Sequence, residues 1–206
     1  GYDFNPKKTQ EILEKAGWVK NENGIYAKKL NQKDKEATPL KLTVVTAKSI
    51  QLMAVLIRDY LKNVGIETDL KIVSLGELQQ NYLRTKNYSA VLIGESYTSS
   101  IDPYVFWHGA AIKDPGLNLS LYNNKKVNKI LEDARQITDP IKRAQKFEDF
   151  QKLVLSDAPA VFLYSPNYIY VVKNTVKNIN LVNLAISSNR FSKINEWYIE
   201  TERIWR

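Results

Sequence analysis

One segment of the sequence concentrates side chains that could hold a small ligand. It carries hydroxyl, carboxylate and aromatic groups at Tyr97, Thr98, Ser99, Asp102, Tyr104 and Trp107. Polar groups orient a ligand by hydrogen bonds and aromatic rings add apolar contact area, a mixture typical of binding clefts. The segment also follows an apolar run at residues 90–93, and α/β sheets bind ligands beyond the carboxyl ends of their strands. The competing interpretation is an ordinary polar loop in which Asp102 caps a helix.

Side chains for catalysis are scarce. The sequence has no cysteine and one histidine, His108, which excludes disulfides, thiolate metal sites and multi-histidine metal sites. It also lacks a glycine-rich phosphate loop, a G-x-S-x-G elbow and an H-E-x-x-H motif. Asp102 and His108 could form an acid–base pair, but a helix cap and a surface histidine explain them without chemistry. We therefore predict a protein that is not an enzyme and that has no cofactor or metal.

The charge balance leaves a second class of function open. Lysine and arginine exceed the acidic residues by 30 to 22, a formal charge of +8, which would attract polyanions. The basic residues form short pairs, such as Lys7–Lys8 and Lys142–Arg143, most of them beside carboxylates on predicted helices. This distribution is typical of a solvated surface, and we expect no nucleic-acid partner. The alternative to a solute-binding protein is a stand-alone basic interaction domain for an anionic polymer or a protein partner.

The helices and strands predicted around the polar segment indicate an α/β fold. Residues 40–46, 66–73 and 90–93 are predicted strands, because they are β-branched, alternating or continuously apolar. Between them, a helix over residues 49–64 carries apolar residues at Leu52, Val55, Leu56 and Tyr60, and a capping box at Ser74 opens another helix. This β-α-β-α-β order predicts one mostly parallel sheet flanked by helices. Residues 19–39, by contrast, are polar and predict a surface excursion.

The second half of the sequence predicts helices followed by strands. Asp102 and Pro103 can start a short helix that runs through Trp107. Two amphipathic patterns, beginning near Val127 and Ile141, predict longer helices separated by a Thr-Asp-Pro turn at 138–140. The apolar runs at 160–164 and 168–172 are typical of buried strands.

Several stretches resemble the family 5 extracellular solute-binding proteins, the peptide- and nickel-type receptors of ABC importers. Those stretches include residues 2–8 and 11–18, PLKLT at 39–43, GIET at 65–68, DPY at 102–104, LEDAR at 131–135 and DAPAVFLY at 157–164. Each stretch is short, but their order and spacing together are specific to the family. The resemblance extends over nearly the whole sequence and corresponds to the C-terminal part of family members.

The resemblance implies a fold, a function and a location. The fold would be a type II periplasmic-binding-protein-like lobe, and residues 1–206 would form a single C-terminal ligand-binding lobe. From about residue 165 the chain would return toward a first lobe. The function would be capture of an oligopeptide or other small solute for an ABC permease, as a monomer. The location would be extracytoplasmic, with membrane attachment only through a lipoprotein anchor on a preceding segment.

One departure from the family pattern concerns the ligand. Peptide-binding members usually carry a tryptophan after the glycine that corresponds to Gly94, and then an aspartate that pairs with the α-amine of the peptide. This sequence has Glu95 and a Tyr-Thr-Ser-Ser run at those places. A free-amine peptide would therefore need Glu95 or Asp102 as a substitute acceptor.

Overall fold

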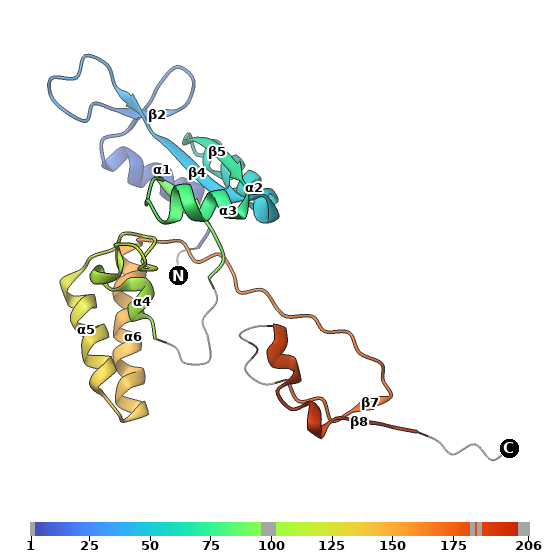
Figure 1. The fold of residues 1–206 in the computed structure, drawn as a ribbon. Helices are drawn as coiled ribbons and strands as arrows, with labels where there is room; N and C mark the ends of the chain where they lie inside the picture. Colours follow the sequence, from blue (N-terminus) through green and yellow to red (C-terminus); the bar gives the residue numbers. More distant parts are fainter. Residues whose placement is uncertain (1–2, 96–101, 182–183, 185–186, 202–206) are drawn as a thin grey trace. The chain divides into compact units, whose positions relative to one another are not determined.

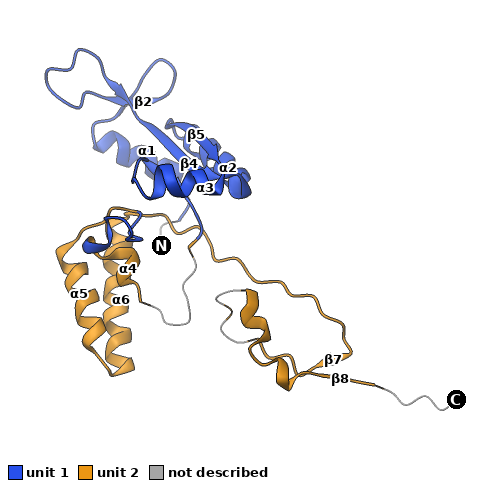
Figure 2. Ribbon diagram, in the orientation of Figure 1, with its two compact units in different colours: residues 1–94, 110–119 blue, residues 95–109, 120–206 orange. Residues whose placement is uncertain are grey.

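The computed structural model describes residues 3–95, 102–181, 184 and 187–201 (Figure 1). These residues form two compact units, which are coloured separately in Figure 2. Unit 1 comprises residues 1–94 and 110–119, and unit 2 comprises residues 95–109 and 120–206. The predicted site residues that the structure describes, Asp102, Tyr104 and Trp107, belong to unit 2. Among the described residues, no helix is long and apolar enough to cross a membrane.

Unit 1 is built around a parallel sheet of three strands, in the order β5-β4-β6. Its elements are α1 (Pro6–Lys15), β1 (Val19–Lys20), β2 (Tyr26–Lys28), β3 (Thr38–Pro39), β4 (Lys41–Ala47), η1 (Lys48–Ile50), α2 (Gln51–Asn63), β5 (Glu67–Val73), α3 (Leu75–Glu77), the π-helix η2 (Leu78–Leu83) and β6 (Ala90–Leu92). The 3₁₀ turn η3 (Gly109–Ala111) begins in unit 2 and ends in unit 1. The prediction that residues 40–46, 66–73 and 90–93 share one sheet is confirmed.

The central strand β4 carries the core of this sheet on both faces. Val44 faces a cluster with Ala54 of α2, whereas Val45 faces a cluster with Leu78. Strand β6 pairs in parallel with β4, so that Val45 lies opposite Val91. Because the sheet is covered on both sides, the continuous apolar run of β6 is explained. The predicted cap is also present, since Ser74 Oγ accepts a hydrogen bond of 3.2 Å from the backbone N–H of Glu77.

The predicted apolar face of the first sheet helix is partly wrong. Leu52, Leu56 and Tyr60 are 77%, 56% and 56% exposed, and the fully buried residue of α2 is Ala54. The small alanine lets the helix approach the sheet closely, while Leu52, Leu56 and Tyr60 follow each other at four-residue intervals along the outer face. The helix itself is confirmed, although it begins at Gln51 after the 3₁₀ turn η1.

The polar excursion at residues 19–39 contains one of the most buried side chains of the unit. Strands β1, β2 and β3 form a small antiparallel sheet, and Tyr26 of β2 is 0% exposed. Its hydroxyl donates to Glu14 Oε1 at 3.1 Å, and its backbone N–H donates to the carbonyl of Gly65 at 2.8 Å. Gly65 has φ +83°, and a Cβ there would lie 2.7 Å from the Gly24 carbonyl oxygen. The excursion is therefore tied to the end of α2 and does not lie free on the surface.

Unit 2 begins with three helices. They are α4 (Tyr104–Trp107), α5 (Lys125–Gln136) and α6 (Pro140–Asp157), and the two longer ones confirm the predicted amphipathic patterns. Asn124 caps α5 through hydrogen bonds to the N–H groups of Lys126 and Val127, and Asp139 caps α6 in the same way. Helices α5 and α6 pack against each other around a core of five residues, Trp107, Val127, Leu131, Phe150 and Val154.

The rest of unit 2 overturns a prediction. Residues 160–164 and 168–172 are not in strands, and Val161, Ile169 and Val171 are 82%, 84% and 88% exposed. The apolar composition of the two runs predicts buried strands, but a strand forms only where a neighbouring strand pairs with its backbone N–H and C=O groups. The elements that follow in the described residues are short: β7 (Val176–Lys177), η4 (Ser187–Phe191), η5 (Ile194–Glu196) and β8 (Tyr198–Ile199). Strands β7 and β8 pair antiparallel.

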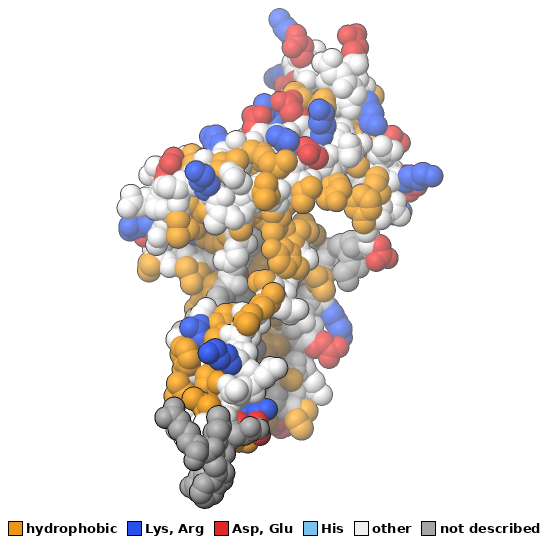
Figure 3. Space-filling view, turned by 90° about the vertical axis from the view of Figure 1, so that its right-hand side faces the viewer, with side chains coloured by type: hydrophobic (Ala, Val, Ile, Leu, Met, Phe, Trp, Pro, Cys, Tyr) orange, Lys and Arg blue, Asp and Glu red, His pale blue; other side chains and the backbone are white. Residues whose placement is uncertain are grey.

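Charged side chains are mixed on the face drawn in Figure 3, where Lys and Arg alternate with Asp and Glu between patches of hydrophobic side chains. Several basic residues are in ion pairs, including Lys41 with Glu67 and Lys129 with Asp133. Such mixing cancels much of the local field that a net charge of +8 would produce. This face therefore offers no single-sign surface for a polyanion.

Candidate functional site

The six predicted site residues fall into two groups. Tyr97, Thr98 and Ser99 lie outside the described residues. Asp102, Tyr104 and Trp107 are described, and they lie at the start and within the single turn of α4. This turn is the point at which the polar segment enters the helical part of unit 2, so its contacts determine how the end of the segment is held.

Asp102 is held by α5. Its Oδ2 accepts two hydrogen bonds from Arg135, from Nε at 3.0 Å and from Nη2 at 2.6 Å. Its Oδ1 accepts the backbone N–H of Tyr104 at 3.1 Å, which bears out the predicted capping role at the start of the turn. Both carboxylate oxygens are therefore used within the chain, and the charge of Asp102 is balanced by a guanidinium.

Two aromatic rings, those of Tyr104 and His108, are stacked behind this ion pair. The Arg135 guanidinium lies 3.7 Å from the ring centre of Tyr104, and the Tyr104 ring stacks on His108 at 4.1 Å with an interplanar angle of 12°. His108 Nε2 lies 3.2 Å from Glu132 Oε1. Arg135 and Glu132 are three residues apart on α5, so one face of that helix holds both ends of the stack.

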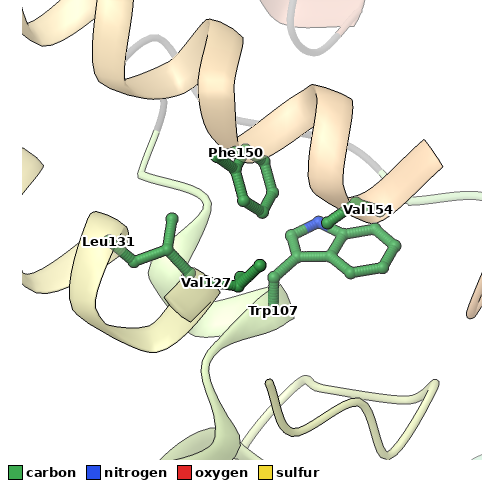
Figure 4. Packing of buried hydrophobic residues seen from close by; sticks show 5 residues of the cluster. All are labelled: Trp107, Val127, Leu131, Phe150 and Val154. Atoms are coloured by element: carbon green, nitrogen blue, oxygen red, sulfur yellow. The ribbon is translucent and has the colours of Figure 1, made fainter. Parts of the chain in front are cut away.

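Trp107 is a core residue of the helical part. It is 6% exposed, and Figure 4 shows its indole between Val127 of α5 and Val154 of α6. Its ring contacts Phe150 edge-on at 6.2 Å between ring centres. The packing role that was weighed against ligand contact is therefore present. The expectation of a surface histidine next to it is wrong, since His108 is 7% exposed and lies beneath Tyr104.

A second polar anchor closes the other end of the helical part. Asp157, the last residue of α6, accepts hydrogen bonds from the hydroxyl of Tyr122 at 2.6 Å and from the side-chain amide of Asn124 at 2.8 Å. These bonds favour the ionised form, so the pKa of Asp157 is lowered. The pKa of the Tyr122 hydroxyl is raised, first by burial and then by the bond to Asp157.

Sequence reasoning missed Arg135 and Glu132 as partners of the polar segment. Both belong to the LEDAR stretch that contributes to the family resemblance, but a helix surface rich in charge gives no signal for one long-range pair. Glu132 and Arg135 are three residues apart, which places both side chains on one face of α5. This spacing was the signal in the sequence that could have identified them together. Among the described residues, no group of three acidic or histidine side chains could hold a metal ion.

The family model that matches this chain is described as bacterial extracellular solute-binding proteins, family 5 Middle, and it matches residues 1–118. Among curated proteins, the oligopeptide-binding protein AppA of Bacillus subtilis is 30% identical over 171 residues. That alignment covers 81% of this chain and 30% of AppA, so the aligned region spans less than a third of that relative's length.

Solved structures agree on the fold. AppA of Bacillus subtilis in complex with a nonapeptide matches with a TM-score of 0.76 at 26% identity, over 96% of this chain and 38% of that protein. NikZ of Campylobacter jejuni in complex with Ni(L-His) matches with a TM-score of 0.68 at 19% identity, over 95% of this chain and 39% of NikZ. The expected periplasmic-binding-protein-like fold, a mixed α/β architecture with a parallel sheet flanked by helices, is confirmed. The chain belongs to the bacterial extracellular solute-binding proteins of family 5.

Proposed function

We propose that the chain captures a solute for an ABC importer, and that it does so without catalysis. The observation that carries this proposal is its 30% identity to an oligopeptide-binding protein over 81% of its own length. The cargo class that this relative favours is an oligopeptide, and the partner is the importer's permease. The protein acts as a monomer outside the cytoplasm, attached to the membrane by a lipoprotein anchor in its full form.

The proposed ligand surface is the polar segment that ends at Asp102. Tyr97, Thr98 and Ser99 provide hydroxyl groups and one ring to the ligand, with Tyr104 at the edge of the surface. Asp102 fixes the end of the segment through Arg135, and Trp107 fixes the turn that follows through its core contacts. Both oxygens of Asp102 are engaged within the chain. Glu95 is therefore the better candidate to pair with a cationic group on the ligand.

The chain acts, in this proposal, as one ligand-binding lobe. The apolar residues that are exposed after residue 160 support this, because Val161, Ile169 and Val171 are more than four-fifths exposed and large exposed apolar patches mark interaction sites. From about residue 165 the chain would return toward a first lobe and be covered there. A single lobe buries only part of a ligand while it bears most of the entropy cost of association. We therefore expect this chain by itself to bind peptides more weakly than micromolar.

The experiment is a titration of the isotope-labelled chain with pooled oligopeptides, followed by amide NMR. The expected result is a set of shifts confined to residues 95–104 and their contacts on α5. Tyr97→Ala is the test variant and Val105→Ala is the matched control, since Val105 lies on α4, shortly after the segment, and is 37% exposed. Shifts that are absent at high peptide concentration, or confined to other elements, would count against the site.

A second titration of the same chain tests the alternative function, a basic interaction domain that binds an anionic polymer. Polyanion binding that rests on contacts to phosphate or sulfate groups weakens steeply with salt because counterions are released, so a heparin or DNA titration at two salt concentrations is the comparison. The solute-binding proposal predicts no saturable complex with either polymer at physiological salt.

A further inference from the structure

A cluster of aromatic rings surrounds an arginine in the C-terminal part of unit 2. The guanidinium of Arg190 lies 4.4 Å from the ring centre of Phe191 and 5.2 Å from that of Tyr170. The Trp197 indole contacts the same two rings, at 6.0 Å and 6.4 Å between centres. Arg190 and Trp197 are therefore neighbours that share two aromatic walls.

The polar contacts of this cluster are incomplete. Arg190 Nη1 donates to the Tyr168 hydroxyl at 2.6 Å and to the Ser187 carbonyl at 3.1 Å. Its Nε and the indole Nε1 of Trp197 are both buried, and neither has a hydrogen-bond partner among the described residues. No described carboxylate pairs with Arg190, whereas the nearby Lys193 and Lys177 pair with Glu196 and Glu200.

Two buried donors without an acceptor are costly, and more so where one belongs to a cation. An acceptor that supplied a negative charge would remove both deficits. A carboxylate is suited to this, because its two oxygens can accept from two separate donors and its single charge balances the one uncompensated guanidinium. The neighbouring lysines are already neutralised, so a more highly charged anion would leave charge unbalanced.

We propose that Arg190 and Trp197 form a carboxylate-binding site, distinct from the polar segment that precedes α4. Arg190 Nε and Trp197 Nε1 donate to the carboxylate, and Tyr170 and Phe191 flank it. Since both donor atoms are covered, the carboxylate enters past the Phe191 ring, which is 40% exposed. The carboxylate comes from a free solute or from an acidic side chain of a polypeptide, because both present the same group.

The test follows the indole N–H resonance of Trp197 in the full chain, assigned by its disappearance in Trp197→Phe. Sodium acetate is titrated against sodium chloride at constant ionic strength. The expected result is a saturable shift with acetate and none with chloride, while the indole resonance of Trp107 stays in place. The proposal is overturned if acetate and chloride have the same effect on Trp197.

Variants at Arg190 separate the site from a general salt effect. Arg190→Met is expected to abolish the acetate shift, and Arg190→Lys to weaken its affinity at least tenfold, because lysine keeps the charge but loses the planar donor geometry. An acetate shift that persists unchanged in Arg190→Met, with the Trp107 resonance native, overturns the proposal. If Arg190→Met does not fold, the Arg190→Lys titration provides the same test.

A second arm identifies the source of the carboxylate. The blocked peptide acetyl-Val-Glu-Val-amide is compared with its glutamine analogue and with acetate. Tighter binding of the glutamate peptide than of acetate assigns the site to a polypeptide side chain, and equal binding assigns it to a small solute. Binding of the glutamine analogue as tight as that of the glutamate peptide contradicts a carboxylate site.

Discussion

Unit 2 contains two regions of similar apolar character that behave differently. In the helical part, residues 102–109 and 120–160, Trp107, Phe150 and Val154 are 6%, 7% and 2% exposed. In the C-terminal stretch, residues 161–201, Val161 and Val171 are 82% and 88% exposed. The same kind of side chain is thus buried in one region and left uncovered in the other.

The difference shows what each element needs from its surroundings. A helix satisfies its backbone hydrogen bonds within itself, so α5 and α6 need only an apolar face to pack on. An extended segment satisfies its backbone only through a neighbouring strand. Residues 160–172 have the composition of a strand but no neighbouring strand, and their apolar side chains stay exposed. The following predictions sharpen or break this comparison, from the largest effect to the smallest.

Trp107→Ala should have the largest effect on stability. It removes a buried indole from the centre of the helical core, which typically costs about 3–5 kcal/mol. Calorimetry should show a large loss of Tm in the transition that contains α5 and α6. Val105→Ala on the same turn is the control. If Trp107→Ala lowers the Tm no more than Val105→Ala does, the helical part has no tight core.

Asp139→Ala should have an intermediate effect. The Asp139 carboxylate accepts the N–H groups of Ile141 and Lys142 at the start of α6, and loss of such a cap costs about 1 kcal/mol. Thr138→Ala, one residue earlier, is the control and should be close to neutral. Equal denaturant midpoints for the two variants would show that α6 does not depend on its cap.

The Asp157 anchor should give a smaller effect that depends on pH. Its pKa is lowered in the folded chain by the Tyr122 hydroxyl and the Asn124 amide, so the unfolded chain takes up this proton at a higher pH than the folded chain. The stabilisation is therefore complete above the ordinary aspartate pKa of about 4 and is lost as pH falls below it. The Tm of wild type should exceed that of Asp157→Asn at neutral pH, and the gap should close in acid. A gap that is constant from neutral pH into acid would contradict the anchor.

Val171→Ala should have the smallest effect. The side chain is 88% exposed, and substitutions of this kind usually change stability by less than about 0.5 kcal/mol. The urea midpoint of the chain should not move. A loss comparable to that of Asp139→Ala would mean that the C-terminal stretch is covered in solution, which would break the comparison.

Local signals in the sequence were enough for the parallel sheet and the long helices. The apolar periodicity of α5 and α6 and the cap at Ser74 act over a few residues, which is the range over which sequence patterns are informative. The burial of Tyr26 was missed, because it depends on the contact of β2 with Gly65, distant in sequence. The prediction of strands at residues 160–164 and 168–172 was wrong for a related reason, because a strand depends on a pairing partner elsewhere in the chain.

The candidate site was predictable in position but not in its supporting contacts. Asp102 was identified as both cap and site residue, and its cap is present. Its partner Arg135 lies on another helix, 33 residues away, and many exposed charges offer equally good pairs in sequence. Composition also could not separate the packing role of Trp107 from ligand contact, because an indole serves both.

The central proposal is that the segment from Tyr97 to Ser99 contacts the ligand. The most direct measurement is the peptide affinity of Tyr97→Ala and Ser99→Ala beside their melting temperatures, using a peptide selected in the pooled titration. The account predicts that each variant binds the peptide more weakly than wild type while its Tm is unchanged. Wild-type affinity in both variants, with unchanged Tm, would contradict it.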